Sequence, residues 1–327
     1  MRMSKTAKKK IVCCCIILIL VLVMIFVGLP ILESSLYSDN HSGDVHVSKT
    51  ITRDGVDYYP RQDITVMMVL GIASQDVAAD SSKYDHTGLC DMAMLLIFDQ
   101  TNEDLRILSL DPDTVMHMST VENEEIQTEP VSTPLALVHS YGSDPKDSCE
   151  HTRKTISDFL YGIEIDHYLA LDLNAIGLLN DAVGGVTVTV EDDFSQVDPS
   201  IGKGSVTLRG DQAITYIRSL QNMGDQANAS RMKRHQQYVQ GFLKAFRTKA
   251  QEDTGFLLSA FEEASSYLVS DSSVLTLAGF VTRYSEYDLV EIVCPEGERL
   301  RNTERTEFHA DETQLDALIL RLFYAPK

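Results

Sequence analysis

Four basic side chains lie within 17 residues of the sequence, namely Arg218, Arg231, Lys233 and Arg234, and Asp225 lies among them. Guanidinium groups bind phosphate oxygens through paired hydrogen bonds, so this cluster indicates a site for a phosphorylated ligand. The alternative is a solvated helix face whose cations balance neighbouring acids, and composition alone favours that alternative. The choice between the two interpretations depends on the rest of the chain.

The rest of the chain is strongly acidic. Residues 1–32 hold five of the 28 basic residues and none of the 48 acidic ones, so the remainder carries 23 basic against 48 acidic residues, a net charge of −25. Binding to nucleic acid depends on cations that neutralise phosphates, and this balance excludes nucleic acid as a partner. An apolar fraction of 44% and a charged fraction of 23% exclude bulk disorder.

Apolar runs bounded by turn residues predict the strands that must position the basic cluster. They lie at 64–71, 92–98, 105–110, 167–172, 186–190 and 289–294. The turn at 99–102 predicts that the second and third runs form a hairpin. Segments with one apolar face predict helices at 147–161, 173–183, 209–220, 230–246, 311–323 and through most of 252–286. Strands interleaved with helices are typical of a layered α/β or α+β domain.

Residues 11–32 carry no charge and are almost wholly apolar, and five basic residues precede them in 1–10. Such a run is long enough to cross a bilayer, and the basic residues favour a cytoplasmic tail. A cleaved signal peptide is the alternative, but the run ends at 27–30 without the small residues of a cleavage site. The sequence therefore predicts a single-pass protein of the cell membrane, with a polar stalk at 33–60 and an extracytoplasmic domain at 61–327.

Signatures of several other enzyme classes are absent from the sequence, among them the nucleophile elbow, the P-loop, the HExxH motif and the Rossmann glycine fingerprint. The cysteines of the body, Cys90, Cys149 and Cys294, have no zinc-site spacing. They allow at most one disulfide, and we expect buried or free thiols. The cysteines at 13–15 lie near the cytoplasmic end of the apolar run. Acylation there is an alternative to a plain role as small apolar residues of a membrane helix.

Nine short segments follow one another in a characteristic order over roughly residues 60–250. The segments are VLGI at 69–72, GLCDM at 88–92, SLDPDT at 109–114, LVHSYG at 137–142, LYGIEIDHY at 160–168, LNDAVGGV at 179–186, GKG at 202–204 with LRGDQA at 208–213, YIR at 216–218 and SRMKR at 230–234. No single segment is specific, but nine in this order behind a predicted membrane anchor resemble the LytR–CpsA–Psr family.

The resemblance implies an extracytoplasmic phosphotransferase of Gram-positive-type walls, which moves an anionic glycopolymer from an undecaprenyl pyrophosphate carrier to peptidoglycan. It implies a central mixed sheet flanked by helices, with a family core at about 61–250 and an extension at 251–327. It also implies an apolar tunnel for the polyprenyl tail, arginines that hold the pyrophosphate, and two aspartates that hold Mg²⁺. Arginines and a hard cation stabilise the charge that develops on a leaving pyrophosphate.

Carried over residue by residue, the resemblance assigns five residues of this chain to the site. Arg218, Arg231 and Arg234 match arginines that hold the pyrophosphate, and we predict them as the catalytic residues. Asp91 matches one aspartate that binds the metal, and Asp225 is the expected second ligand. The predicted site thus combines a cationic cluster with a magnesium ion.

Five positions depart from the family's pattern. Leu89, Pro112 and Leu220 stand where the family has arginines, His235 stands where it has glutamine, and Pro134 lies near the place of a lysine. Each lost arginine removes a charge-assisted contact worth about 1.5–3 kcal/mol. The candidates to compensate are Lys83, His86 and His139. Two hypotheses stay open: a Mg²⁺-dependent transferase, and a non-catalytic paralogue that binds polyprenyl lipid or a wall-assembly partner.

Overall fold

The computed structural model describes residues 50–73, 88–118, 121–122, 125–126, 131–219, 227–253, 256–301 and 305–326. The chain divides into two units, Met1–His46 and Val47–Lys327, and every described residue belongs to the second. The predicted cytoplasmic tail, the predicted anchor at 11–32 and most of the predicted stalk therefore lie outside the described residues. Among the helices that the structure does describe, none is long and apolar enough to span a membrane.

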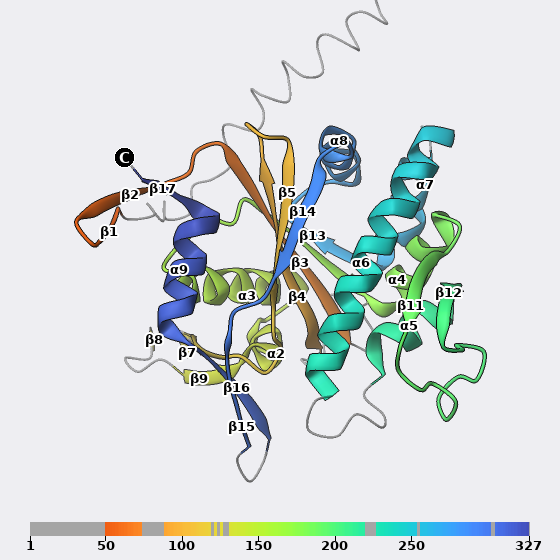
Figure 1. Cartoon of the computed structure of the whole chain (residues 1–327), viewed down its shortest axis with the longest axis horizontal. Coiled ribbons are helices and arrows are strands. Elements are labelled where there is room, and N and C mark those ends of the chain that lie inside the picture. The colour runs from red at the N-terminus through yellow and green to blue at the C-terminus, as the bar shows by residue number, and fades with distance from the viewer. Residues whose placement is uncertain are drawn as a thin grey trace, which may run out of the picture. The chain divides into compact units, whose positions relative to one another are not determined.

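A six-stranded mixed sheet forms the centre of the second unit, with the order β13-β10-β3-β4-β5-β14 (Figure 1). Its strands are β3 Ile64–Ala73, β4 Leu89–Asp99, β5 Asp104–Leu110, β10 His167–Asp172, β13 Leu268–Ser270 and β14 Asp288–Val293. Strand β4 runs antiparallel to both β3 and β5, whereas β10 is parallel to β3 and β14 is parallel to β5. The predicted hairpin and the predicted mixed sheet are confirmed.

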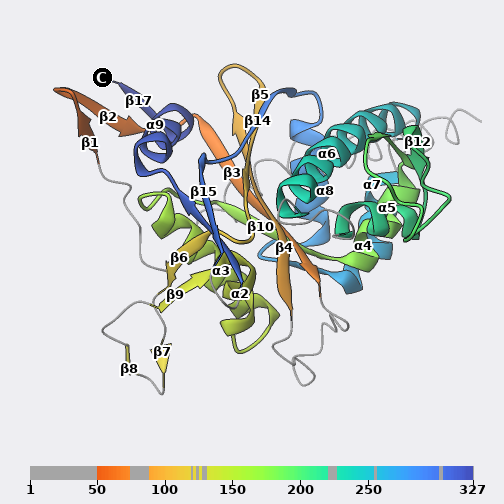
Figure 2. The same cartoon turned by 60° about the horizontal axis from the view of Figure 1, so that its bottom comes forward.

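Helices cover both faces of this sheet because its strands are apolar on both sides (Figure 1, Figure 2). In β4, Leu95 and Ile97 pack into one core, and Met94 and Phe98 pack into another. The helices on the first face are α2 Leu135–Val138, α3 Pro145–Phe159 and α9 Glu312–Phe323. The helices on the second face are α6 Ala227–Glu252, α7 Phe256–Ala264 and α8 Val274–Tyr284.

A third core lies beside α6 and holds the helices that carry the predicted arginines. It is built from α4 Leu173–Ala182, α5 Asp211–Arg218 and the hairpin of β11 Val186–Val190 with β12 Gly204–Leu208. In β11, Val186, Val188 and Val190 are buried and the two threonines between them are exposed, which is the period of two that predicted this strand. The hairpin packs against α6 and so fixes the side of α6 that faces α5.

The remaining elements are short. They are β1 Ile51–Arg53, β2 Val56–Pro60, β6 Val115–Met118, β7 Val121–Glu122, β8 Glu125–Ile126, β9 Val131–Pro134, β15 Gly297–Arg301, β16 Thr306–Ala310, β17 Tyr324–Pro326 and the 3₁₀ turns His139–Tyr141 and Ser265–Tyr267. The first two correct the sequence prediction, because residues 51–60 were expected to belong to the stalk. Strand β2 instead pairs with β17, and Ile51 and Tyr58 pack against the main core.

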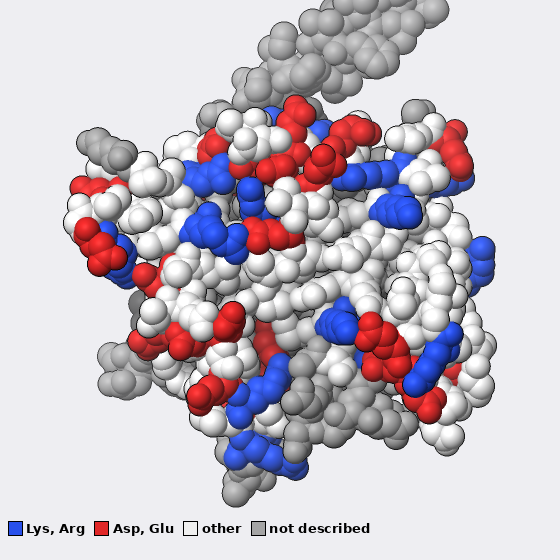
Figure 3. Space-filling model, in the orientation of Figure 1, with Lys and Arg blue, Asp and Glu red and all other residues white. Residues whose placement is uncertain are grey.

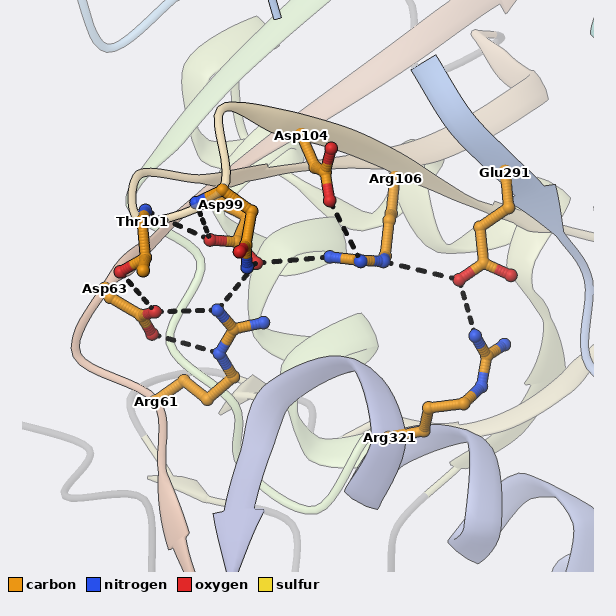
Figure 4. Close-up of polar contacts among 9 residues, drawn as sticks. Arg61, Asp63, Asp99, Thr101, Asp104, Arg106, Glu291 and Arg321 are labelled. Carbon is orange, nitrogen blue, oxygen red and sulfur yellow. Dashed lines mark hydrogen bonds and ion pairs between the residues drawn. The ribbon is translucent and has the colours of Figure 1, made fainter. Parts of the chain in front are cut away.

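An ionic network joins the β4–β5 turn to β14 and α9 (Figure 4). Asp99 is 1% exposed, and it accepts hydrogen bonds from Arg61 at 2.8 Å and from Arg106 at 3.3 Å. Arg106 also contacts Glu291 at 3.5 Å, and Glu291 in turn contacts Arg321. Burial opposes ionisation of Asp99, but the hydrogen bonds from Arg61 and from the turn outweigh burial and hold its pKa well below the ordinary value.

Replacing Asp99 with asparagine is expected to lower the free energy of unfolding by about 3 kcal/mol, because two arginines lose their buried carboxylate. Urea unfolding of the variant measures this loss. Asp104→Asn is the matched control, since Asp104 is 25% exposed and contacts Arg106 at 3.3 Å. We expect the control to cost less than about 1 kcal/mol. Equal losses in the two variants would show that the network does not depend on the buried carboxylate.

Candidate functional site

Asp91 owes its position to a bulge in β4. Gly71 pairs with Met92 and Ile72 pairs with Cys90, so Asp91 is an extra residue between two paired ones. Cys90 packs in the core under α3 and α9, whereas Met92 packs toward α6 on the opposite face. A bulge re-aims the side chain of the extra residue, and here it leaves the Asp91 carboxylate beside the start of α6.

Two of the predicted arginines reach this carboxylate. Nη1 of Arg231, in the first turns of α6, donates to Oδ1 of Asp91 at 3.0 Å. Nε of Arg218, the last residue of α5, lies 3.7 Å from Oδ2 of Asp91. The Arg231 side chain is 6% exposed and that of Arg218 is 52% exposed. The structure thus brings together three predicted site residues from three separate elements.

The other edge of the Arg231 guanidinium is unpaired within the described residues. Its Nε is buried and has no hydrogen-bond partner among the described residues. Nη2 donates to none of them either, so Nε and Nη2 together present two unused donors. Buried donors are almost always paired in folded proteins. A planar two-donor edge matches the oxygens of a phosphate, which makes Arg231 the strongest candidate for an anion-binding residue.

The third predicted arginine, Arg234, lies in a different environment. Its Nε donates to the carbonyl of Tyr216 at 2.7 Å, its Nη1 binds Asp192 at 2.6 Å, and its Nη2 donates to the carbonyl of Ser219. The guanidinium also lies 5.7 Å from the ring centre of Phe194. These contacts hold the end of α5 against α6. None of these contacts involves Asp91, which binds Arg231 and Arg218 instead.

His235, which stands where the family has glutamine, is a buried neutral histidine. Its Nε2 donates to the carbonyl of Ile217 at 3.0 Å, one residue before Arg218. Burial, together with the charge of Arg231, lowers the pKa of His235 to about 3. Burial also lowers the pKa of His139 to about 4, so neither histidine supplies the positive charge of a missing arginine near neutral pH.

The acid sensitivity of the fold is expected to depend on His235. Because the native pKa is far below that of an unfolded histidine, only the unfolded chain takes up this proton as the pH falls below about 6.5. The contribution of His235 to the free energy of unfolding is therefore fully present at neutral pH and is lost as the pH falls toward the native pKa. Between pH 7 and pH 5 the loss is roughly 2 kcal/mol for this one residue.

Thermal unfolding at pH 7 and pH 5 tests this expectation with two variants. His235→Gln retains an amide that can donate to the Ile217 carbonyl, and its Tm should fall less between the two pH values than that of the native protein. His309→Gln makes the same change at an exposed position of β16 and should follow the native protein. Identical pH dependence in all three proteins would refute the assignment.

The structure describes four of the five positions that depart from the family's pattern, and His235 is one of them. Leu89 is exposed at the start of β4, and Pro134 is buried at the end of β9. Pro112 is also buried, and the carboxylates on either side of it, Asp111 and Asp113, both contact Arg299 from β15. The fifth departure, Leu220, lies outside the described residues. So do the predicted metal ligand Asp225 and two of the candidates to compensate, Lys83 and His86.

Of the two predicted metal ligands, Asp91 and Asp225, the structure describes Asp91. Mg²⁺ in proteins is commonly held by one or two carboxylates together with waters and substrate phosphates. Within the described residues no group of three or more histidine, cysteine or acidic side chains is placed to hold a metal. Among the described residues, the donor set therefore fits an ion that shares the Asp91 carboxylate with phosphate oxygens.

An apolar cavity of about 250 Å³ lies between the sheet and the helices of its second face. The sheet contributes side chains along nearly the whole of β4, from Met92 to Phe98, a distance of about 20 Å at the usual rise of a strand. The helical walls include Ile176, Leu179, Ile217, Tyr238, Val239, Phe242, Leu243, Phe261 and Phe280. Its shape and lining suit a flexible hydrocarbon chain.

Residues of the Asp91–Arg231 cluster are sequence neighbours of residues that line this cavity. Met92 and Ile217 line the cavity, and each is the immediate neighbour of a cluster residue, Asp91 and Arg218 respectively. Helix α6 carries Arg231 in its first turns and cavity-lining residues from Tyr238 onward. The arrangement suits an amphiphilic ligand with an anionic head at Arg231 and an apolar tail along β4.

Sequence reasoning missed two features of this region. The apolar runs at 64–71 and 92–98 predicted buried strands, but they carry no signal that separates a filled core from a cavity. Arg299 was missed because its partner Asp111 lies 188 residues earlier in the chain. The cysteine prediction is confirmed for the body: Cys90 and Cys149 are buried free thiols and Cys294 is a half-buried one.

The chain belongs to the LytR_cpsA_psr family, whose model matches residues 33–322. Among curated relatives, polyisoprenyl-teichoic acid–peptidoglycan teichoic acid transferase TagU of Halalkalibacterium halodurans is 26% identical over 217 residues, which cover 64% of each chain. The protein of the same name from Bacillus subtilis is 28% identical over 141 residues, which cover 40% of this chain and 45% of that protein. The matches thus span less than two thirds of these relatives.

Solved structures show the same fold. The structure of Bacillus subtilis TagV aligns with a TM-score of 0.62 and 20% identity, covering 80% of this chain and 96% of that one. TagT bound to LI-WTA aligns with a TM-score of 0.61 and 18% identity, covering 86% and 98%. Protein gbs0355 from Streptococcus agalactiae gives a TM-score of 0.65 at 18% identity, covering 80% and 86%.

Proposed function

We propose that this protein transfers an anionic glycopolymer from a polyprenyl pyrophosphate carrier to peptidoglycan. The observation that carries the proposal is the apolar cavity along β4, whose lining residues Met92 and Ile217 directly follow Asp91 and directly precede Arg218 in the chain. The Asp91 carboxylate is bound by Arg231, whose buried Nε has no partner among the described residues. The names of the TagU relatives support the substrate class, since they describe polyisoprenyl-linked teichoic acid and peptidoglycan. The family assignment supports a role in the cell envelope.

In the proposed reaction, an acceptor hydroxyl oxygen forms a bond to the phosphorus nearer the glycopolymer. The bond from that phosphorus to the bridging oxygen breaks, polyprenyl monophosphate leaves with the bonding electrons, and the hydroxyl proton passes to water. Arg231 and Arg218 would hold the pyrophosphate oxygens and stabilise the charge of the leaving group. Arg234 would hold α5 in place for this contact.

Magnesium and the membrane anchor are further parts of the proposal. Asp91 would hold Mg²⁺ together with Asp225 and the phosphate oxygens, and the ion would neutralise charge on the transferred phosphoryl group. The apolar run at 11–32 would anchor the protein in the membrane that contains the carrier lipid, with the body outside the cell. The family resemblance supports the magnesium ion, and the uncharged run behind five basic residues supports the anchor.

A second candidate function is supported by the loop at 111–113. Pro112 is buried there between two carboxylates, in the place of an arginine of the family's pattern. A protein that binds the carrier lipid without transferring its glycan needs the cavity and Arg231, but it does not need a complete set of arginines. The loop therefore favours a lipid-binding paralogue as the alternative.

The release of polyprenyl monophosphate separates these functions. The full chain is incubated with Mg²⁺ and a glycan linked to polyprenyl pyrophosphate, with and without peptidoglycan, and the lipid products are identified by mass spectrometry. We expect Mg²⁺-dependent release together with glycan attached to peptidoglycan. Tight binding of the lipid without release would support the paralogue. A protein that neither binds nor cleaves the lipid would contradict both functions.

A further inference from the structure

A second cavity of about 270 Å³ opens between the first turns of α6 and the β15–β16 hairpin. Helix α6 contributes Met232, Lys233 and Gln236 to its wall, β15 contributes Arg299, and Asp111 follows the end of β5. The hairpin is held in place because Phe308 of β16 donates its backbone N–H to the carbonyl of Asp113 at 2.9 Å. The cavity is thus built from segments that are far apart in the sequence.

This cavity lies at the same end of the sheet as the Asp91–Arg231 cluster. Ala93 pairs with Leu110 in the sheet, so the residue before Met92 and the residue after Leu110 lie at the same end of neighbouring strands. Those residues are Asp91 of the cluster and Asp111 of the cavity. On α6, Arg231 of the cluster directly precedes Met232 of the cavity wall. A ligand in the cavity would therefore lie beside a phosphate held by Arg231.

The cavity wall offers both hydrogen-bond donors and acceptors. Asp111 is 4% exposed, and its carboxylate accepts from the guanidinium of Arg299 and from the backbone N–H of Asp113 at 2.9 Å. Burial raises the pKa of Asp111, although the Asp113 amide and Arg299 oppose the rise. Gln236 donates to the sulfur of Cys294 at 3.1 Å, and no described residue donates to its carbonyl oxygen.

This chemistry disfavours a second anion. Arg299 is shared between two carboxylates, Asp111 and Asp113, and Lys233 is paired with Glu191 at 2.6 Å. A phosphate in the cavity would meet the Asp111 carboxylate at short range, and the described lining offers no unpaired cation to offset it. A hydroxyl group, by contrast, donates to a carboxylate or an amide oxygen and accepts from a guanidinium or an ammonium group.

We propose that this cavity is the acceptor subsite, which holds an uncharged carbohydrate ring of the peptidoglycan glycan beside the Asp91–Arg231 cluster. The inference rests on the proposed function, because it names the site for the second substrate of the same reaction. Gln236 and Asp111 would accept hydrogen bonds from the sugar hydroxyls, and Lys233 would donate to them. The neighbouring Arg231 would keep the phosphorus within reach of one hydroxyl.

Methionine residues provide separate reporters for the two cavities. Met232 lines the acceptor cavity, and Met94 lines the apolar cavity. The full chain labelled with ¹³C at the methionine methyl groups is titrated with an uncharged tetrasaccharide of N-acetylglucosamine. We expect the Met232 signal to shift in a saturable way while the Met94 signal stays in place. No shift of Met232, or an equal shift with inorganic phosphate, would overturn the proposal.

Two variants and a second probe complete the test. Gln236→Ala should raise the dissociation constant of the tetrasaccharide by about fivefold, the usual effect of one hydrogen bond. Gln240→Ala, one turn later at an exposed position of the same helix, should leave it unchanged, and equal effects would overturn the assignment. If farnesyl pyrophosphate shifts the Met94 signal and the tetrasaccharide does not shift the Met232 signal, the acceptor subsite is refuted and the proposed lipid site stands. If the tetrasaccharide shifts Met232 and farnesyl pyrophosphate does not shift Met94, the acceptor subsite is supported and the proposed binding of the lipid carrier is refuted.

Discussion

Replacing Arg231 with methionine is expected to raise the dissociation constant for polyprenyl pyrophosphate by roughly 10- to 100-fold. The native side chain has two unused donors on a buried guanidinium edge, and a hydrogen bond from a charged donor contributes about 1.5–3 kcal/mol. Methionine retains an unbranched chain of similar reach but no donor. Binding of the lipid to the full chain in phospholipid nanodiscs, measured by native mass spectrometry, gives the constant.

Two further arginine variants make this result specific. Arg231→Lys keeps the charge and loses the planar fork, so it should fall between the native protein and the methionine variant. Arg209→Met makes the same substitution at an exposed arginine before α5 and should bind like the native protein. Unchanged binding in Arg231→Met, or equal losses in Arg231→Met and Arg209→Met, would remove Arg231 from the site.

The double variant Val69→Phe/Val239→Phe is expected to weaken lipid binding by about a hundredfold. Val69 on β3 and Val239 on α6 line the apolar cavity from opposite sides, and two added rings would occupy its middle. Excluding about four methylene-sized groups from an apolar site costs roughly 3 kcal/mol. The same binding assay measures the loss, and urea unfolding checks that the variant remains folded.

A control variant tests whether the added ring must lie inside the cavity to weaken binding. Val290→Phe makes the same change at an exposed residue of β14, which is 52% exposed, and should not affect lipid binding. A short soluble ligand such as inorganic pyrophosphate should bind the double variant as it binds the native protein, because it needs only the arginines. Full lipid affinity in a folded double variant would mean that the tail binds elsewhere.

Most long elements were predictable from the sequence because their signals are local. The run at 92–98 is apolar on both faces and β11 alternates with a period of two, so each indicates a strand without knowledge of its neighbours. Short strands lack such signals. Strand β13 has three residues inside a segment predicted as largely helical, and it exists because it pairs with β10 about a hundred positions away in the chain.

The candidate site was predictable where side-chain type decides the role, and not where a neighbour decides it. Asp91 was assigned through the family resemblance and Arg231 also through the basic cluster, and the two side chains meet at 3.0 Å. Arg234, three residues later, has the same side chain, but it donates to the carbonyls of Tyr216 and Ser219 at the end of α5. Arg299 could not be found, since only the folded hairpin brings it to Asp111.

The lipid that accompanies the purified protein tests the central claim most directly. The full chain and the Val69→Phe/Val239→Phe variant are purified in parallel, and their bound lipids are extracted and identified by mass spectrometry. We predict polyprenyl phosphate or pyrophosphate with the native protein and its loss from the variant. Ordinary membrane phospholipid alone, in equal amounts with both proteins, would contradict the claim that the cavity along β4 holds a polyprenyl chain.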